Sequence, residues 1–131
     1  MILKVNIQSN KTILVIDDET FICDILQTCL ELLHGCRTVT TKSGKEGLVL
    51  AAEIKPDLII LDIIMPNMDG FSFLKQLEAN PQVSHIPVIL LTSRADLTEP
   101  HAIAKLKVKG AIAKPFYPLK LFSEICRILS W

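Results

Sequence analysis

The stretch LIILDIIMPNMDG, residues 58–70, surrounds one acidic residue, Asp62, with apolar side chains on both sides. The run LIIL at 58–61 is short and continuously apolar, and turn-forming residues follow it, which predicts a strand buried on both faces of a sheet. A carboxylate next to such a strand costs free energy unless a cation or hydrogen-bond donor accompanies it. Asp62 is therefore expected to have a role that needs its charge.

Outward from Asp62, apolar runs of the same kind alternate with amphipathic stretches along the chain. The predicted strands lie at 12–16, 36–41, 58–61, 87–92 and 110–113. The predicted helices lie at 19–34, 44–55, 71–79 and about 100–107, with a last one that carries Leu121, Phe122, Ile125, Ile128 and Leu129 on one face. This alternation predicts an α/β fold: a doubly wound, five-stranded parallel sheet with five helices covering its two faces.

Polar residues follow four of these strands directly. Asp17 and Asp18 follow the first, Asp62 the third, and Lys114 the fifth, while Thr92 ends the fourth. Because the carboxyl ends of parallel strands meet at one edge of the sheet, we expect these side chains to share one crevice. Carboxylates in close proximity repel one another unless a cation joins them, and oxygen donors of this kind suit Mg²⁺. Lys114 and Thr92 would bind phosphoryl oxygens, and Asp62 would be a nucleophile for a phosphoryl group.

Composition limits the alternatives. The chain has 131 residues, with 14 basic and 14 acidic side chains, which suits one domain and gives no positive excess for direct binding of nucleic acid. Its four cysteines show no C-x-x-C spacing and predict small core side chains in a reducing, cytoplasmic setting. The opening MILKVNIQSN has too few consecutive apolar residues for a signal peptide. No run of apolar residues in the sequence is long enough for membrane insertion. We expect an N-terminal extension at 1–11 and one domain at 12–131.

Four motifs, in their order and spacing, resemble the receiver domain of two-component response regulators over residues ~12 to 130. They are VIDDE (15–19), LDIIMPNMDG (61–70), LTS (91–93) and KPF (114–116). The resemblance implies a CheY-like, flavodoxin-like sheet of order 2-1-3-4-5. It also implies a phosphorelay protein that catalyses only its own phosphotransfer and autodephosphorylation. Because the sequence ends at Trp131, directly after the last predicted helix, we expect a stand-alone domain that signals through protein contacts.

Site roles follow from the same resemblance. Asp62 would be the phosphoacceptor, Asp18 a direct Mg²⁺ ligand with Asp17 beside it, and the carbonyl of Ile64 a further ligand. Thr92 would be the switch hydroxyl, and Lys114 the phosphate partner before a cis Pro115. A sensor histidine kinase or a histidine phosphotransfer protein would donate the phosphoryl group, and the downstream protein target is left open.

Several alternatives stay open from sequence. Ala111 stands where the family usually has Tyr or Phe, and Pro100 fits only the first turn of a helix whose start the sequence does not define. Adjacent acids such as Asp17 and Asp18 are also common in a helix cap or solvated turn. The main alternative function is a pseudo-receiver, a protein-binding module on the same fold that is never phosphorylated. A phosphohydrolase with an aspartyl nucleophile is a more distant one.

Overall fold

The computed structural model describes residues 10–131, so most of the predicted N-terminal extension lies outside the described residues. Its five strands form one parallel sheet of order β2-β1-β3-β4-β5, as predicted. The strands are β1 (Thr12–Ile16), β2 (Arg37–Thr41), β3 (Leu58–Leu61), β4 (Val88–Thr92) and β5 (Gly110–Ala113). The helices are α1 (Thr20–Thr28), α2 (Gly44–Ile54), α3 (Gly70–Ala79), α4 (Pro100–Leu106) and α5 (Pro118–Leu129).

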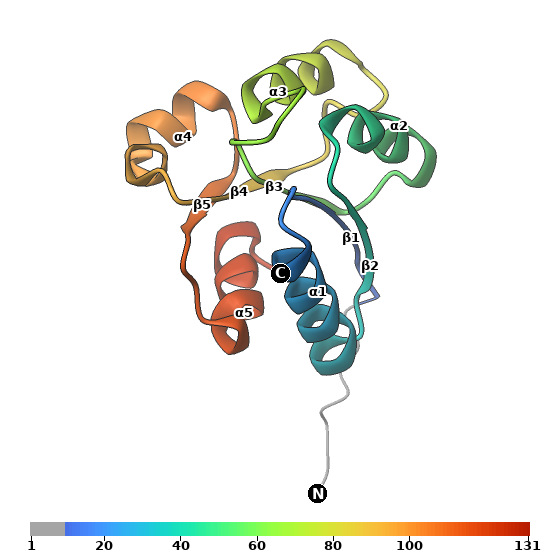
Figure 1. The fold of residues 1–131 in the computed structure, drawn as a ribbon, viewed down its shortest axis with the longest axis vertical. Coiled ribbons are helices and arrows are strands. Elements are labelled where there is room, and N and C mark those ends of the chain that lie inside the picture. The colour runs from blue at the N-terminus through green and yellow to red at the C-terminus, as the bar shows by residue number, and fades with distance from the viewer. Residues whose placement is uncertain (1–9) are drawn as a thin grey trace, which may run out of the picture.

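The helices cover the two faces of the sheet unequally. Helices α1 and α5 lie on one face, and α2, α3 and α4 lie on the other (Figure 1). Successive strand residues point to opposite faces, so Ile13 and Val15 of β1 pack with the α1 and α5 side chains, while Leu14 and Ile16 pack with those of α2 and α3. The central strands β1, β3 and β4 are therefore apolar except for Thr12 and Thr92 at their ends, because each face lies against a helix layer.

The first helix differs from the continuous helix predicted over 19–34. Helix α1 ends at Thr28, and a π-helical turn spans Cys29–Leu33. A wider turn rotates the following side chains relative to an α-helix, and Leu33, seven residues after the buried Leu26, is 52% exposed. Gly35 has φ 68°, a left-handed conformation that ends the whole helical segment after His34, the last residue of the predicted range.

Helix α4 is held loosely compared with its neighbours. Pro100 occupies its first turn, which resolves where this helix begins, and a 3₁₀ turn, η3 (Ala95–Thr98), precedes it. No α4 side chain is fully buried, whereas every other α-helix buries at least two residues. Within residues 10–131, no helix has both the length and the apolar character needed to cross a membrane.

A glycine in the interior of α2 has a packing reason that the sequence alone does not show. Gly47 costs helix stability relative to Ala, by about 1 kcal/mol. A Cβ at this residue would lie 2.5 Å from Ile16 Cδ1 and 3.3 Å from the Phe73 ring. The missing side chain thus lets α2 approach β1 and α3 closely.

We predict that Gly47→Ala lowers the free energy of unfolding by about 1 to 3 kcal/mol, because overpacking outweighs the gain in helix propensity. The Ile16→Val change removes the methyl group that the new Cβ would meet. Combined with it, Gly47→Ala should therefore cost less than in the parent protein, as measured by urea unfolding. Additive costs in the double variant would contradict this explanation.

Candidate phosphoacceptor site

The backbone of the sheet positions the site residues one step beyond the strand ends. The Asp17 N–H donates to the Thr41 carbonyl at 3.1 Å, and the Asp62 N–H donates to the Ile16 carbonyl at 2.9 Å. On the other side, the Lys114 N–H donates to the Thr92 carbonyl at 2.8 Å. The sheet hydrogen bonding therefore continues into the site and aligns residues from four strands.

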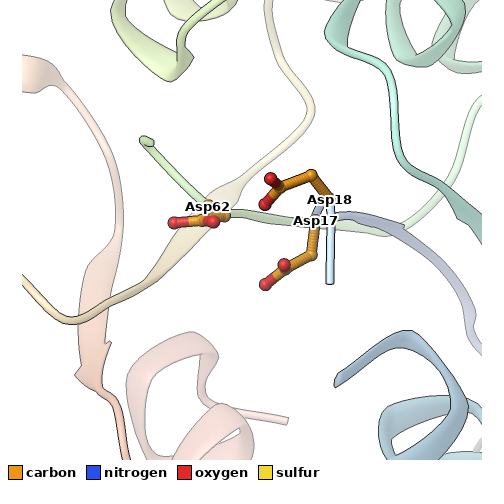
Figure 2. Close-up of side chains that lie close together, drawn as sticks. All are labelled: Asp17, Asp18 and Asp62. Atoms are coloured by element: carbon orange, nitrogen blue, oxygen red, sulfur yellow. The ribbon is translucent and has the colours of Figure 1, made fainter. Parts of the chain in front are cut away.

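Three carboxylates converge at this edge. Asp17 and Asp18 follow β1, and Asp62 follows β3 (Figure 2). One oxygen from each lies within 4.8 Å of the others, and Asp17 and Asp62 are buried, with 1% and 6% of their surface exposed. The structure thus brings together the three acids that the sequence placed at strand ends.

Lys114 lies among these acids rather than at the surface. Its Nζ is 2.8 Å from Asp17 Oδ2 and 3.6 Å from Asp62 Oδ2, and its side chain is only 12% exposed. It also lies 2.9 Å from Glu19 Oε1. The peptide bond between Lys114 and Pro115 is cis, in agreement with the family resemblance.

Burial changes the acid–base properties of these groups. Burial, with the nearby charge of Asp17, raises the pKa of Asp62 from 3.8 to about 6, although the Lys114 charge opposes this shift. Burial likewise raises the pKa of Asp17, against hydrogen bonds from Lys114 and the Glu19 backbone. For Lys114, burial would lower the pKa, but its bonds to Asp17 and Glu19 raise it above its ordinary value. The site therefore holds more negative charge than one lysine balances.

The donor set fits a hard divalent cation. The three carboxylates each offer one oxygen within 4.8 Å of the others, and a donor set of oxygens without sulfur or imidazole matches the preference of Mg²⁺. Among residues 10–131, the Lys114 ammonium is the one partner of Asp17 Oδ2, so this oxygen has lone pairs available. Asp17, Asp18 and Asp62 are the residues that would hold the metal.

Ile64 and Thr92 are two further residues that the sequence predicts for this site. The Ile64 N–H donates to Asp62 Oδ1 at 3.3 Å, while its carbonyl stays a predicted ligand. Thr92 is fully buried at the end of β4, and its hydroxyl oxygen accepts from the Arg94 N–H at 3.0 Å. Its switch role also stays a prediction.

The loop after Asp62 is held by its own turn geometry. The Gly70 N–H donates to the Ile63 carbonyl at 2.7 Å, and Asp69 caps α3 by accepting from the Ser72 N–H at 2.9 Å. A Cβ at Gly70 would lie 2.6 Å from Ile63 Cα, so only glycine allows this approach. The loop residues of the LDIIMPNMDG motif thus fix the chain that carries Asp62.

Sequence reasoning missed Glu19. Glu19 lies within the motif VIDDE, but the sequence does not predict its role, because an exposed acid before a helix has no distinctive pattern. Its contact with Lys114 spans 95 residues of sequence and exists only in the folded chain.

Comparison with known proteins identifies the family. Residues 13–126 match the response regulator receiver domain, and the chain belongs to this family. It is 36% identical over 120 residues to the alkaline phosphatase synthesis transcriptional regulatory protein PhoP of Bacillus subtilis, over 92% of this chain and 49% of that protein. It is 32% identical over 127 residues to the probable transcriptional regulator ycf27 of Guillardia theta, over 97% of this chain and 48% of that protein.

Solved structures agree. The chemotaxis response regulator CheY4 of Vibrio cholerae superposes with a TM-score of 0.82 at 28% identity, over 92% of this chain and 99% of that chain. The N-terminal domain of a receiver protein from Methanoculleus marisnigri JR1 gives 0.74 at 34% identity, over 94% of this chain and 99% of that chain. The chain spans about half the length of the sequence relatives named above. It is a receiver domain of the response regulator family, and Asp17, Asp18 and Asp62 form an acidic pocket that is consistent with a phosphoacceptor.

The raised pKa of Asp62 predicts that the free energy of unfolding depends on pH when a chelator keeps metal ions out of the site. Between pH 4 and 6 the unfolded chain ionises Asp62 while the folded chain keeps it protonated, so stability falls as pH rises through this window. Above it, Asp62→Asn should be more stable than the parent protein by about 1 to 3 kcal/mol.

The difference should disappear below about pH 3, where Asp62 is protonated in both states. Urea unfolding at a series of pH values, with Asp24→Asn as a control for loss of one exposed acid, measures it. An Asp62→Asn protein no more stable than its parent at pH 7.5 would refute the argument.

Proposed function

We propose that Asp62 accepts a phosphoryl group from a histidine kinase or a histidine phosphotransfer protein in a Mg²⁺-dependent step. The observation that carries this is the buried Asp62 carboxylate, 3.6 Å from the Lys114 ammonium and within 4.8 Å of two further carboxylates. A binding surface without chemistry has no need of three converging acids. The cytoplasmic location expected from the cysteines and the protein-contact output belong to this proposal.

In the proposed step, an Asp62 carboxylate oxygen forms a bond to phosphorus as the N–P bond of the donor phosphohistidine breaks. The electron pair of the broken bond stays on the imidazole nitrogen, and the product is an aspartyl phosphate. Lys114 donates to a phosphoryl oxygen, and the Thr92 hydroxyl donates to another. When bound, Mg²⁺ would supply positive charge to the same oxygens.

Intact mass spectrometry after incubation with Mg²⁺ and acetyl phosphate tests this function. We expect addition of one phosphoryl group to the parent protein and to the surface control Asp24→Asn. Neither Asp62→Asn nor Asp18→Ala should be modified, the second because charge neutralisation is lost while the nucleophile remains. Modification that persists in Asp62→Asn, or that needs no divalent metal, would overturn the assignment.

A pseudo-receiver is the second candidate, and Ala111 is the observation that favours it. Ala111 lacks the aromatic ring that the family usually has at this position, so no such ring can change its position when the protein is phosphorylated. With Thr98, Phe116, Tyr117 and Leu121, Ala111 lines a cavity of about 330 Å³. A signal would then have to pass through the backbone after β4. The Arg94 N–H, which donates to the Thr92 hydroxyl, gives a direct report of it.

Amide hydrogen exchange with beryllofluoride, a mimic of the phosphoryl group, separates the two candidates. If Thr92 turns toward the ligand, the Arg94 N–H loses its acceptor and exchanges faster, and protection changes over residues 92–107, where α4 has no buried side chain. Helices α1 and α2 should not change. A bound ligand without any change in 92–107 would favour the pseudo-receiver.

A further inference from the structure

Glu19 contacts Lys114, the lysine that also contacts Asp17 and Asp62. It is the residue before α1, and its Oε1 lies 2.9 Å from Lys114 Nζ. The ammonium has three N–H donors, and three carboxylates surround it, at 2.8 Å from Asp17, 2.9 Å from Glu19 and 3.6 Å from Asp62. Lys114 is therefore shared among them.

Glu19 also contacts Asp17 from its backbone. The Glu19 N–H donates to Asp17 Oδ1 at 2.9 Å, while Lys114 occupies Asp17 Oδ2. Asp17, Lys114 and Glu19 thus form a closed ring of contacts. Glu19 is the one member of the lysine's carboxylate set that lies outside the group of acids able to share a metal.

Metal binding and the observed position of Lys114 conflict. A divalent cation held by Asp17, Asp18 and Asp62 repels an ammonium placed on the Asp17 oxygen, because both are positive and the site is buried. Lys114 must leave Asp17 when the cation arrives. Glu19, whose side chain is 58% exposed, is free to stay with the lysine as it moves.

We propose that Glu19 is a positioning residue that retains Lys114 when Mg²⁺ takes Asp17, and so strengthens Mg²⁺ binding and keeps the ammonium beside Asp62. This inference rests on the metal-dependent function proposed above. Its distinctive consequence is that the effect of Glu19 on metal affinity depends on Lys114.

Calorimetric titration of the chelator-treated protein with Mg²⁺ tests it. Glu19→Ala should weaken Mg²⁺ binding by about three- to tenfold, and Glu19→Gln by less, since an amide oxygen still accepts from lysine. Asp24→Ala, which removes an exposed acid from α1, the helix that Glu19 precedes, should change affinity by less than about twofold. In a Lys114→Met background, Glu19→Ala should also have an effect of less than about twofold.

Urea unfolding in chelator gives a control without metal. Glu19→Ala and Asp24→Ala should unfold alike, because exposed ion pairs contribute little to stability. Equal Mg²⁺ affinities for these two variants would overturn the inference, and so would an undiminished Glu19→Ala effect in the Lys114→Met background. If Lys114→Met does not fold, the comparison of Glu19→Ala with Asp24→Ala decides. A parent protein that binds no Mg²⁺ would overturn the proposed function as well.

Discussion

The close approach of the Lys114 ammonium to the buried carboxylates of Asp17 and Asp62 is the interaction on which the carboxyl edge of the sheet depends. Two carboxylates about 4 Å apart repel by about 4 kcal/mol at an effective dielectric constant of 20. The Lys114 ammonium reduces this repulsion. Lys114 follows β5 and Asp62 follows β3, and these two strands are not neighbours because β4 lies between them. The sheet order 2-1-3-4-5, with its strand ends in register, brings these charges together.

The site is built at the expense of stability, and the two packed faces of the sheet compensate. Asp62 carries a raised pKa because it is buried near another acid, so its ionised form destabilises the folded chain. The strands that hold it are apolar on both faces, and close contacts such as that of Gly47 with Ile16 bring the helices tightly onto the sheet. A cation or phosphoryl group that binds only the folded state would recover part of the cost.

Packing is uneven around the sheet, and the weakest part adjoins the site. Helix α4 has no buried residue and follows the loop that begins at Thr92, whereas α1, α2 and α3 insert side chains such as Leu26, Ala51 and Phe73 into the two cores. Local opening of this segment should therefore cost less free energy than opening of the other helices. Such a division between a rigid scaffold and a loosely held segment suits a protein that transmits a signal through contacts.

The sequence by itself determined the alternation of buried strands and helices, and with it the edge of the sheet where Asp17, Asp18, Asp62, Thr92 and Lys114 meet. It could do so because the spacing of apolar residues and the polar residues at strand ends are both local features of the sequence. Tertiary structure decided the rest: the π-helical turn that exposes Leu33, the glycine at 47, and the bond between Glu19 and Lys114. The last two depend on atoms far apart in the chain, since Gly47 faces Ile16 and Phe73 and Glu19 lies 95 residues from Lys114. No local pattern records what a side chain meets after folding.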